Sequence, residues 1–412
     1  MQDNEKKPAL RFKGFTDPWE QRKISELAEK TYGGGTPTTS NEAFWNGNIP
    51  WIQSSDIVDG KLMGVEPRKY ITQTGLNSSA TQLVPKDSIA IITRVGVGKL
   101  AYMPFSYSTS QDFLSLSKLN TEPFFTVYAC YKKLQSELNT VQGTSIKGIT
   151  KDELLAKTIS VPVYSEQKQI GSFFTQLDTL ITLHQRKYEK LVNIKKSMLD
   201  KMFPQNGASV PEIRFKGFTD PWEQRKLTNL CEKFTDGDWI EAKDQSDSGV
   251  RLVQTGNVGV TEYLDKPNNK KWISFETFEQ LHCEEVYPGD ILISRLPEPA
   301  GRACIMPNLG TKMITAVDCT IVRPNAVTST RFLLQYLSSQ AYFDAVNTCL
   351  AGGTRQRISR GNLAQFNVPI PSSKIEQEKI GEVLEKLDTL ITLHQREHIK
   401  SILEVKLVKR NE

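Results

Sequence analysis

The sequence RFKGFTDPWEQRK occupies residues 11–23 and occurs again, unchanged, at residues 214–226. A second string, LDTLITLHQR, occupies residues 177–186 and recurs at residues 387–396. We call the first pair the aromatic repeat and the second pair the helix repeat. The aromatic repeats are offset by 203 positions (11 to 214) and the helix repeats by 210 (177 to 387), so one half of the chain duplicates the other. The intervening sequences have diverged, which predicts one scaffold built twice around two different variable parts.

The length and composition of the chain limit the classes of protein to which it can belong. Its 412 residues exceed the size at which a single hydrophobic core keeps growing, so two globular units are expected. Lys plus Arg number 52 and Asp plus Glu 47, and the net charge of +5 permits an anionic partner without demanding one. The six cysteines include no C-x-x-C pair, which indicates reduced core thiols rather than disulfides or zinc ligands. No apolar stretch reaches about 18 residues, so we expect a soluble, cytoplasmic protein with no membrane partner.

Two segments of the chain carry the pattern of long amphipathic helices. Residues 166–203 and 376–412 place apolar side chains on a seven-residue period, with polar side chains between them. At about 1.5 Å per residue the first helix is roughly 55 Å long, too long to pack on one small domain. The two helices are therefore predicted to pair as an intramolecular coiled coil that also offers surfaces to partner subunits. The expected contact positions are Ile170, Leu177, Leu180, Ile181, Leu191, Ile380, Leu387, Leu390 and Ile391.

The direction of this pairing is open to two arrangements. A parallel coiled coil stacks the two globular units at one end. An antiparallel coiled coil places them at opposite ends and gives the chain a pseudo-two-fold internal repeat. We favour the antiparallel arrangement, because the internal two-fold that it gives suits a duplicated sequence.

Between the repeated strings, each half alternates short strand-like runs with turns rich in Gly, Pro, Asn and Ser. The expected strands lie within residues 49–57, 87–104, 113–119, 250–258, 289–307 and 318–324, and the helices that follow them at 124–140 and 330–350. This order predicts the α/β class, a mixed α+β domain in each half followed by its long helix. The expected divisions are 1–165 (first domain with its aromatic repeat), 166–203 (first long helix), 204–375 (aromatic repeat and second domain) and 376–412 (second long helix).

No catalytic motif is recognisable in either half. The run GVGK at residues 96–99 lacks the first glycine of a phosphate-binding P-loop, and Leu100 stands where that motif needs Ser or Thr. Metalloprotease, nucleophile-elbow and dinucleotide-binding motifs are also missing, although a duplicated chain would be expected to carry any catalytic set twice. His394 and His398 lie four residues apart, but no other ligand is near them in sequence, so we expect helix surface or helix contact there. The chain is therefore predicted to be non-catalytic, with no metal site.

Polar residues recur at the ends of the predicted strands in both halves. Arg94 and Arg295 each close an apolar strand and open a loop that carries a second cation, Lys99 or Arg302. A rigidly held Arg at a strand end suits bidentate contact with guanine or with a phosphate. Aligning the halves pairs Gln53 with Gln254, Asp56 with Asn257, Asp87 with Asp290, Arg94 with Arg295 and Asp112 with Asp318. The alternative is an ion pair between strands, which would join each Arg to the Asp of its own half.

A second cationic loop precedes each long helix. GTSIKGITKDEL (residues 143–154) and GTRQRISRGNL (residues 353–363) share a Gly-Thr, an Ile and a closing Leu. Hydroxyls and cations on an exposed loop suit contact with the phosphodiester backbone, although a solvated loop that begins a helix would have the same composition. The complete set of candidate DNA contacts is Gln53, Asp56, Arg94, Lys99, Lys147, Lys151, Gln254, Asn257, Arg295, Arg302, Arg355, Arg357 and Arg360.

The aromatic repeat is predicted to have a structural function. Phe12, Phe15 and Trp19 are spaced to pack on the end of the coiled coil, and the same spacing recurs in the second copy. Asp17-Pro18 is a sequence typical of a helix start. The alternative is a platform on which nucleic-acid bases stack.

The chain resembles the specificity subunit of a type I restriction-modification system. The resemblance rests on the two repeated strings, on the Gly-Thr…Ile…Leu loops, and on the V-P-V/I and Glu-Gln pairs that precede each long helix, and it spans essentially the whole chain. It implies two target-recognition domains, each of which reads one half of a bipartite DNA target, and a long intramolecular coiled coil of the two helices that sets the unread gap. Since the two variable parts differ, the implied target is asymmetric.

The resemblance also implies partners and cofactors. Double-stranded DNA, two modification (methyltransferase) subunits and the restriction (motor-nuclease) subunits are the expected partners. S-adenosylmethionine, ATP and magnesium are expected on those subunits, and no cofactor on this chain.

Two other classes of protein remain as alternatives. One is a self-sufficient DNA methyltransferase or nuclease with a duplicated recognition core. The other is a coiled-coil scaffold that does not bind DNA.

Overall fold

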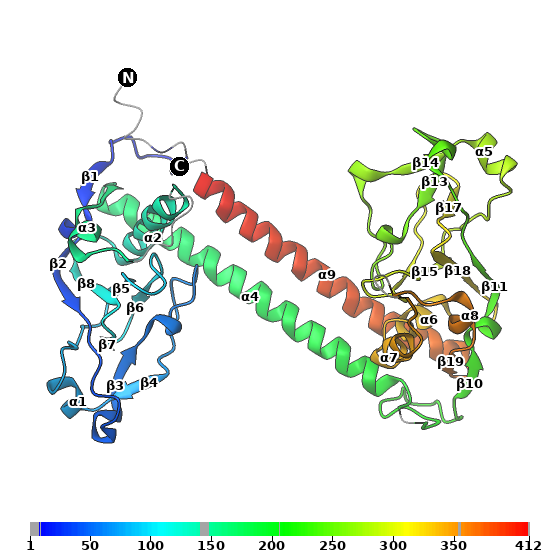
Figure 1. The fold of residues 1–412 in the computed structure, drawn as a ribbon, viewed down its shortest axis with the longest axis horizontal. Helices are drawn as coiled ribbons and strands as arrows, with labels where there is room; N and C mark the ends of the chain where they lie inside the picture. The colour runs from blue at the N-terminus through cyan, green and yellow to red at the C-terminus, as the bar shows by residue number, and fades with distance from the viewer. Residues whose placement is uncertain (1–7, 9, 141–147, 206, 353–355, 411–412) are drawn as a thin grey trace. The chain divides into compact units, whose positions relative to one another are not determined.

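The computed structural model describes residues 8, 10–140, 148–205, 207–352 and 356–410 of the 412, and it leaves the side chains of residues 139–140, 398 and 401–410 undescribed. The chain divides into two compact units, unit 1 (Met1–Leu183 with His398–Glu412) and unit 2 (His184–Glu397). Each contains helices and sheets (Figure 1), so the fold is of the mixed α/β type that the sequence predicts. In the described part of the chain, no helix is both long enough and apolar enough to cross a membrane.

Unit 1 is built on two small sheets. The first has the order β2-β8-β5-β6 and is antiparallel throughout, and the second has the order β4-β3-β7 with β3 and β7 parallel. The strands are β2 (Ala28–Gly33), β3 (Trp45–Ile52), β4 (Lys69–Ile71), β5 (Ser88–Ile92), β6 (Leu100–Met103), β7 (Ser108–Thr109) and β8 (Phe113–Leu119), and the helices are α1 (Gln73–Asn77), α2 (Pro123–Thr140) and α3 (Lys151–Ala156).

The central strand β5 explains why its sequence is apolar at nearly every position. Ile89 and Ile91 belong to a core that includes residues of α2, whereas Ala90 and Ile92 belong to a second core shared with β3. A strand buried on both faces needs apolar residues in both alternating sets.

Unit 2 repeats this plan with different side chains. Its first sheet has the order β11-β18-β15-β16, and its second has the order β12-β14-β13-β17. The strands are β11 (Cys231–Asp236), β12 (Gln245–Ser246), β13 (Val250–Val253), β14 (Lys271–Ile273), β15 (Ile291–Ser294), β16 (Ala303–Ile305), β17 (Met313–Thr315) and β18 (Cys319–Pro324), and the helices are α5 (Phe275–Gln280), α6 (Thr330–Tyr336), α7 (Gln340–Thr348) and α8 (Arg360–Ala364).

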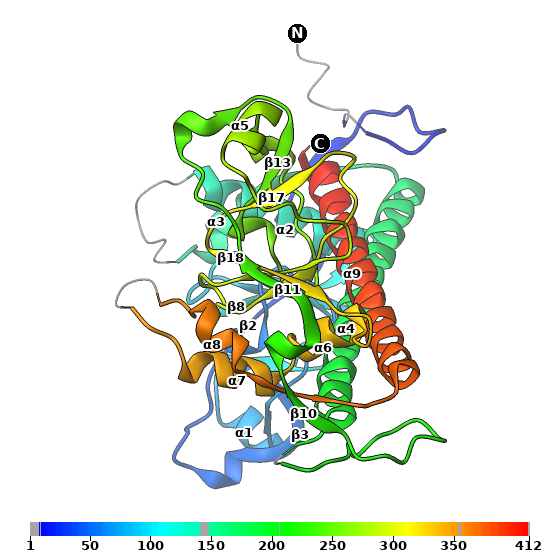
Figure 2. The same ribbon diagram turned by 90° about the vertical axis from the view of Figure 1, so that its right-hand side faces the viewer.

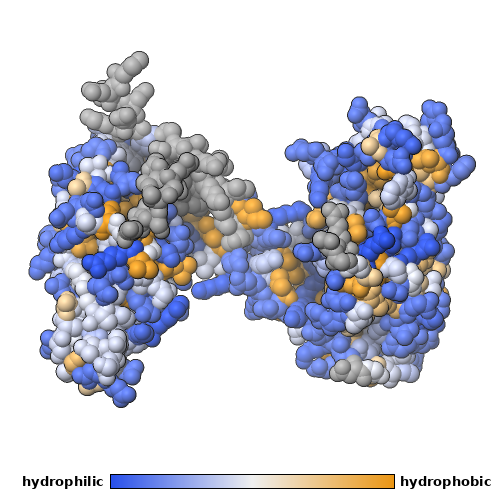
Figure 3. Space-filling view, viewed as in Figure 1, coloured by the Kyte–Doolittle hydropathy of each residue, from blue (hydrophilic) through white to orange (hydrophobic). Residues whose placement is uncertain are grey.

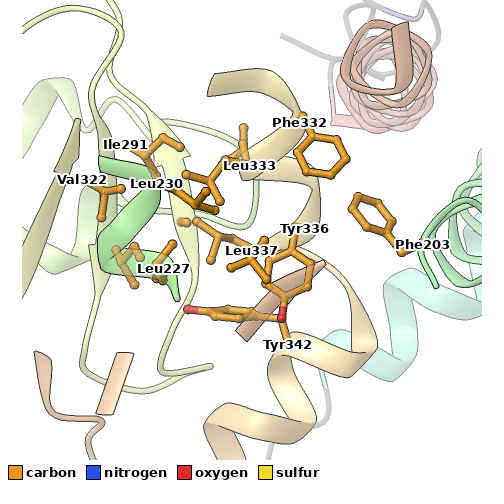
Figure 4. Close-up of a cluster of buried hydrophobic side chains, with 14 of the residues drawn as sticks. Phe203, Leu227, Leu230, Ile291, Val322, Phe332, Leu333, Tyr336, Leu337 and Tyr342 are labelled. Carbon is orange, nitrogen blue, oxygen red and sulfur yellow. The ribbon is translucent and has the colours of Figure 1, made fainter. Parts of the chain in front are cut away.

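One expected helix is divided. The helical stretch predicted over residues 330–350 is helical, but it consists of two helices, α6 and α7. The break follows from capping, because the Ser339 side chain accepts a hydrogen bond from the backbone N–H of Tyr342 and starts a new helix. The division directs Tyr336 and Tyr342 into one core with Phe203 (Figure 4), and the Phe203 and Phe332 ring centroids are 5.2 Å apart.

The last four residues of each aromatic repeat form a strand. β1 (Glu20–Lys23) pairs with β9 (Thr158–Val161), and β10 (Glu223–Lys226) pairs with β19 (Asn367–Ile370), both antiparallel. The prediction that Asp17-Pro18 begins a helix was therefore wrong, because the following EQRK sequence finds a strand partner more than 130 positions along the chain.

The first residue of each aromatic repeat anchors the long helix of the same half. Arg11 Nε and Nη2 donate to Glu166 Oε1 and Oε2, both at 2.7 Å, and Arg214 makes the same two bonds to Glu376 at 2.7 and 2.9 Å. Bidentate Arg–carboxylate pairs are geometrically specific. In both halves, the start of the aromatic repeat is therefore bound to the first turn of the long helix in the same way.

The glutamine beside each of these glutamates makes a second fastening. Gln167 accepts from the backbone N–H of Glu122 at 2.8 Å and donates to Pro162 O at 2.8 Å. Gln377 repeats the contact in unit 2, where it accepts from Ser329 N–H at 2.8 Å. The Glu-Gln pair therefore ties the long helix to the segment that starts α2 or α6.

The long helices are α4 (Tyr164–Met202) and α9 (Lys374–Arg410). Their first turns pack on the globular core of their own half: Ile170 and Leu177 against the unit 1 core, and Ile380 and Leu387 with the unit 2 core. The sequence pattern predicted helix-to-helix contacts for these four residues and did not indicate that they pack on the globular cores.

Within unit 2, α4 from His184 onward and α9 up to Glu397 lie side by side (Figures 1 and 2). His184 contacts His394, and further along α4 Lys195 forms an ion pair with Asp388. The partner number falls as the α4 number rises, so the two helices run in opposite directions here.

Candidate nucleic-acid interface

In unit 1, the end of strand β5 meets the cationic loop that precedes α3. The backbone N–H of Ile149 donates to Thr93 O at 2.7 Å, and a Cβ added to Gly148 would lie 4.0 Å from the Cα of Arg94. Arg94 and Lys151 are both exposed, and no ion pair of Arg94 is present among the described residues. The structure thus joins two groups of residues that the sequence singled out separately.

In unit 2, the same two segments meet. The backbone N–H of Ile358 donates to Arg295 O at 3.2 Å, which places Arg357 and Arg360 beside the end of β15. Of the candidate contacts, Lys147 and Arg355 lie outside the described residues.

The cations of unit 2 surround two carboxylates. Asp236 Oδ1 is 3.5 Å from Arg295 Nε, and Asp236 Oδ2 is 3.8 Å from Arg360 Nε. Asp318 lies 3.9 Å from Arg357 Nη1. The expected ion pair of Arg295 with Asp318 is not the one formed, because Arg295 binds Asp318 through its backbone N–H and turns its side chain to Asp236.

The strand registers correct the alignment of the two halves by one residue. Ile89 lies opposite Leu116 and Ile291 opposite Val322, and these partners stand four residues after Asp112 and Asp318 respectively. The register therefore matches Thr93, not Arg94, to Arg295, and Ser88, not Asp87, to Asp290. Arg94 occupies the position of Leu296, one residue further into the loop, so the two arginines are not structural counterparts.

The same registers identify the residue that matches Asp236. Gly33 lies opposite Leu114 and Asp236 opposite Thr320, two residues after the matched aspartates. Unit 1 therefore has no carboxylate at this point, and a Cβ added to Gly33 would meet nothing within 4 Å. In unit 2 the carboxylate of Asp236 lies beside Arg295 and Arg360, whereas the matching position in unit 1 carries no negative charge.

Two of the candidate pairs form the turns that follow β3 and β13. The backbone N–H of Gln53 donates to Asp56 Oδ2, and that of Gln254 donates to Asn257 Oδ1, each at 3.0 Å. Asp56 and Asn257 are buried, which gives them a structural function, whereas Gln53 and Gln254 are half-buried at the start of each turn.

Arg302 and Lys99 differ in their environments. Arg302 donates to four backbone carbonyls, those of Val258, Leu296, Pro299 and Thr255, at 2.6 to 3.0 Å. Burial lowers the pKa of its guanidinium from its ordinary value. Its donors hold two loops together and are not directed to a ligand, whereas Lys99 is half-buried just before β6.

The sequence pattern missed two residues at this surface, and an exposed tryptophan in the loop that follows them. Asp236 and Thr235 end strand β11 beside Arg360, which lies 3.5 Å from Thr235 Oγ1. Trp239 follows in the next loop and is 72% exposed. A tryptophan in a polar loop, three residues after a strand, is the signal that could have found it.

The fold and these surfaces define a duplicated α/β protein in which each half exposes loop cations beside the end of a strand. This chain belongs to the family of type I restriction modification DNA specificity domains, whose profile matches residues 16–193 and 219–404.

Individual relatives agree with the family. The specificity subunit of the type I restriction enzyme EcoR124I/EcoR124II from Escherichia coli is 29% identical over 199 residues, which is 44% of this chain and 48% of that protein. The MjaIX specificity subunit of Methanocaldococcus jannaschii is 27% identical over 192 residues, 45% of this chain and 44% of the relative. These two alignments span about half the length of the relatives. The MjaVIII specificity subunit of the same organism is 22% identical over 401 residues, 92% of this chain and 88% of the relative.

A solved structure shares the fold of the whole chain. The S subunit of a type I restriction-modification system from M. genitalium superimposes with a TM-score of 0.64 at 14% identity, and the match covers 98% of both chains. At this identity the likeness concerns the fold.

Proposed function

We propose that this chain is the DNA-reading, non-catalytic subunit of a type I restriction-modification complex, and that each unit reads one half of a bipartite, asymmetric target. The observation that carries the proposal is the repeated meeting of a strand end with a cationic loop, at Thr93 with Ile149 and at Arg295 with Ile358. Exposed Arg and Lys beside a rigid strand end provide phosphate and base-edge contacts.

The difference between the two surfaces supports an asymmetric target. Asp236 stands between Arg295 and Arg360 in unit 2, whereas Gly33 stands at the matching position in unit 1. A carboxylate can also accept a hydrogen bond from cytosine. Two surfaces with different charge and donors would select different half-sites.

The long helices support a function in spacing and in subunit docking. The 39 residues of α4 correspond to about 58 Å of helix, which exceeds one turn of DNA at roughly 34 Å. Apolar residues interrupt the mostly hydrophilic surface of these helices (Figure 3), and Val192, Ile194, Leu390 and Leu393 are exposed. We infer that the helices pair as a coiled coil that sets the gap, and that they contribute to docking two adenine-methyltransferase subunits and, through the complex, the motor-nuclease subunits. S-adenosylmethionine, ATP and magnesium would then act on those partners.

The test is long-read detection of methyladenine in cells that carry this chain with its modification partner. The expected result is a bipartite asymmetric motif. Arg94→Ala should weaken or relax one half-site, and Arg357→Ala the other, while the gap stays the same. Arg22→Ala and Arg225→Ala are matched controls, because both remove an exposed Arg that pairs with a nearby Glu on β1 or β10.

Several outcomes would contradict the proposal. Equal loss at both half-sites from one loop variant, or an effect of the controls as large as that of Arg94→Ala, would remove the assignment of one half-site to each unit. Binding of S-adenosylmethionine by this chain alone would favour a self-sufficient enzyme. Duplex binding that is absent or insensitive to salt would favour a scaffold, since phosphate contacts make affinity fall steeply with salt.

The spacing function has its own test. Deleting one heptad, residues 191–197, should shorten the gap by about 10 Å, or roughly three base pairs. An unchanged gap in the methylated motif would show that the helices do not set it.

A further inference from the structure

Two histidines of the helix repeat meet in unit 2. His184 of α4 and His394 of α9 are the same residue in the two copies of LDTLITLHQR. Their Nδ1 atoms lie 3.2 Å apart and their ring centroids 5.5 Å apart. Because the helices run in opposite directions here, the duplication brings the two copies of one residue face to face.

A carboxylate completes the group. Glu397 Oε2 lies 3.2 Å from Nδ1 of His184 and 3.8 Å from Nδ1 of His394, and ligand atoms of all three residues lie within 4.8 Å of one another. The imidazoles are largely shielded by the two helices, whereas the Glu397 side chain is 44% exposed. Solvent therefore reaches one side of the group, which gives an ion access to it.

The separations match those between ligands of a tetrahedral metal ion. Zinc binds His nitrogen and carboxylate oxygen at about 2.0–2.2 Å, and this geometry places neighbouring ligand atoms roughly 3.3 Å apart. Two of the three separations are 3.2 Å, and the third is 3.8 Å. Only the separation between Glu397 and His394 exceeds the ligand spacing, by about 0.5 Å.

We propose that His184, His394 and Glu397 form a Zn²⁺ site that links α4 to α9, with water as the remaining ligand. Two imidazoles and one carboxylate are ligand types that zinc uses with an open fourth position. The helices come from different halves of the chain, so the ion cross-links segments that are about 210 residues apart in sequence (184 to 394). An ion that binds only the folded helix pair also stabilises that pairing.

Three other arrangements would place the same residues close together or bind metal differently. One imidazole can donate a hydrogen bond to the other, or a protonated imidazole can pair with Glu397, and neither arrangement needs an ion. A metal could instead use His394 and His398, four residues apart on α9 alone. The experiment below separates these cases.

The test is titration of the full, metal-free chain with Zn²⁺ by calorimetry and with Co²⁺ by visible absorption. The expected result is one ion per chain, a tetrahedral Co²⁺ spectrum without a thiolate charge-transfer band, and a higher melting temperature with Zn²⁺. His184→Gln, His394→Gln and Glu397→Gln should each weaken binding at least tenfold. His398→Gln should leave it unchanged.

The control is His282→Asn, which alters an exposed histidine of the same unit outside the cluster. Asn suits the positive φ of 50° at this position. Unchanged Zn²⁺ binding in His184→Gln, loss in His398→Gln, or no stoichiometric binding by the wild-type chain would each overturn the proposal. The Co²⁺ spectrum of the wild-type chain keeps the test decisive should a variant fail to fold.

Discussion

Replacing Glu376 with Ala should destabilise unit 2 strongly. The Glu376 side chain is 1% exposed and accepts two short hydrogen bonds from Arg214, at 2.7 and 2.9 Å. Removing one partner of a buried ion pair costs about 3–5 kcal/mol, because the other charge stays in the protein without its counter-ion. Arg214 also donates to Asp220 O and is not completely buried, so we expect the lower end of that range, about 3 kcal/mol.

The assay is urea unfolding combined with hydrogen exchange that localises the loss to unit 2. With a slope of about 3 kcal/mol per molar urea for a unit of this size, the midpoint should fall by about 1 M. The matched control is Glu223→Ala, which breaks the Arg225–Glu223 pair in the same unit, where the side chains are 42% and 48% exposed. An exposed pair of this kind contributes about 0–1 kcal/mol.

The comparison between the two variants decides the question. Equal urea midpoints for Glu376→Ala and Glu223→Ala would refute the idea that the buried Arg214–Glu376 pair stabilises unit 2. Loss of exchange protection in unit 1 would also refute it, because the bonds of Glu376 lie within unit 2.

Three further predictions concern packing, charge and pH. Gly381→Ala should lower the melting temperature, because the new Cβ would lie 2.8 Å from both Arg331 Cβ and Phe332 N. The steric clash costs about 1–3 kcal/mol of folding free energy, which outweighs the gain of roughly 1 kcal/mol in helix propensity. A higher melting temperature would contradict this prediction. Asp236→Asn should free Arg295 and Arg360 from their shared carboxylate, so that they can contact phosphates. The slope of log K for duplex binding against log salt concentration should then become steeper by about 0.9 per added phosphate contact. An unchanged slope would contradict this prediction. Burial raises the pKa of Glu122 above its ordinary 4.5, so its ionisation opposes folding at neutral pH. Glu122→Gln should therefore be more stable than wild type at pH 7, and the difference should shrink as the pH falls toward about 4.5, below which both states of the wild type are protonated. Unfolding at a series of pH values measures it, and a difference independent of pH would contradict the prediction.

Local patterns predicted the elements that depend on local sequence. The run FLSLSKL was expected to be a strand and is β8, and the two long amphipathic patterns are α4 and α9. Their apolar period and the lack of internal breakers are properties of neighbouring residues. The division of residues 330–350 at Ser339 is also local in origin, and the capping signal of that serine could have been read from the sequence.

The parts of the candidate surface that depend on distant contacts could not be read in this way. The one-residue shift between Arg94 and Arg295 follows from strand registers, in which Ile89 and Ile291 find partners on β8 and β18. The carbonyl cage of Arg302 likewise combines loops more than 40 positions apart. The assignment of DNA contacts to these residues stays a prediction, and its exposed members among the described residues are Arg94, Lys151, Arg357 and Arg360.

The repeated strings are best understood through the contacts that each copy makes. Arg11 with Glu166 and Arg214 with Glu376 are the same fastening made twice, each within one half of the chain. Such contacts constrain both copies equally, whereas Gly33 and Asp236 show that the surface positions between the repeats are free to differ. The histidine of the helix repeat is a different case, since its two copies contact each other, at 3.2 Å. A change at either copy then alters a single shared site, which is why the Zn²⁺ titrations of His184→Gln and His394→Gln should give the same loss.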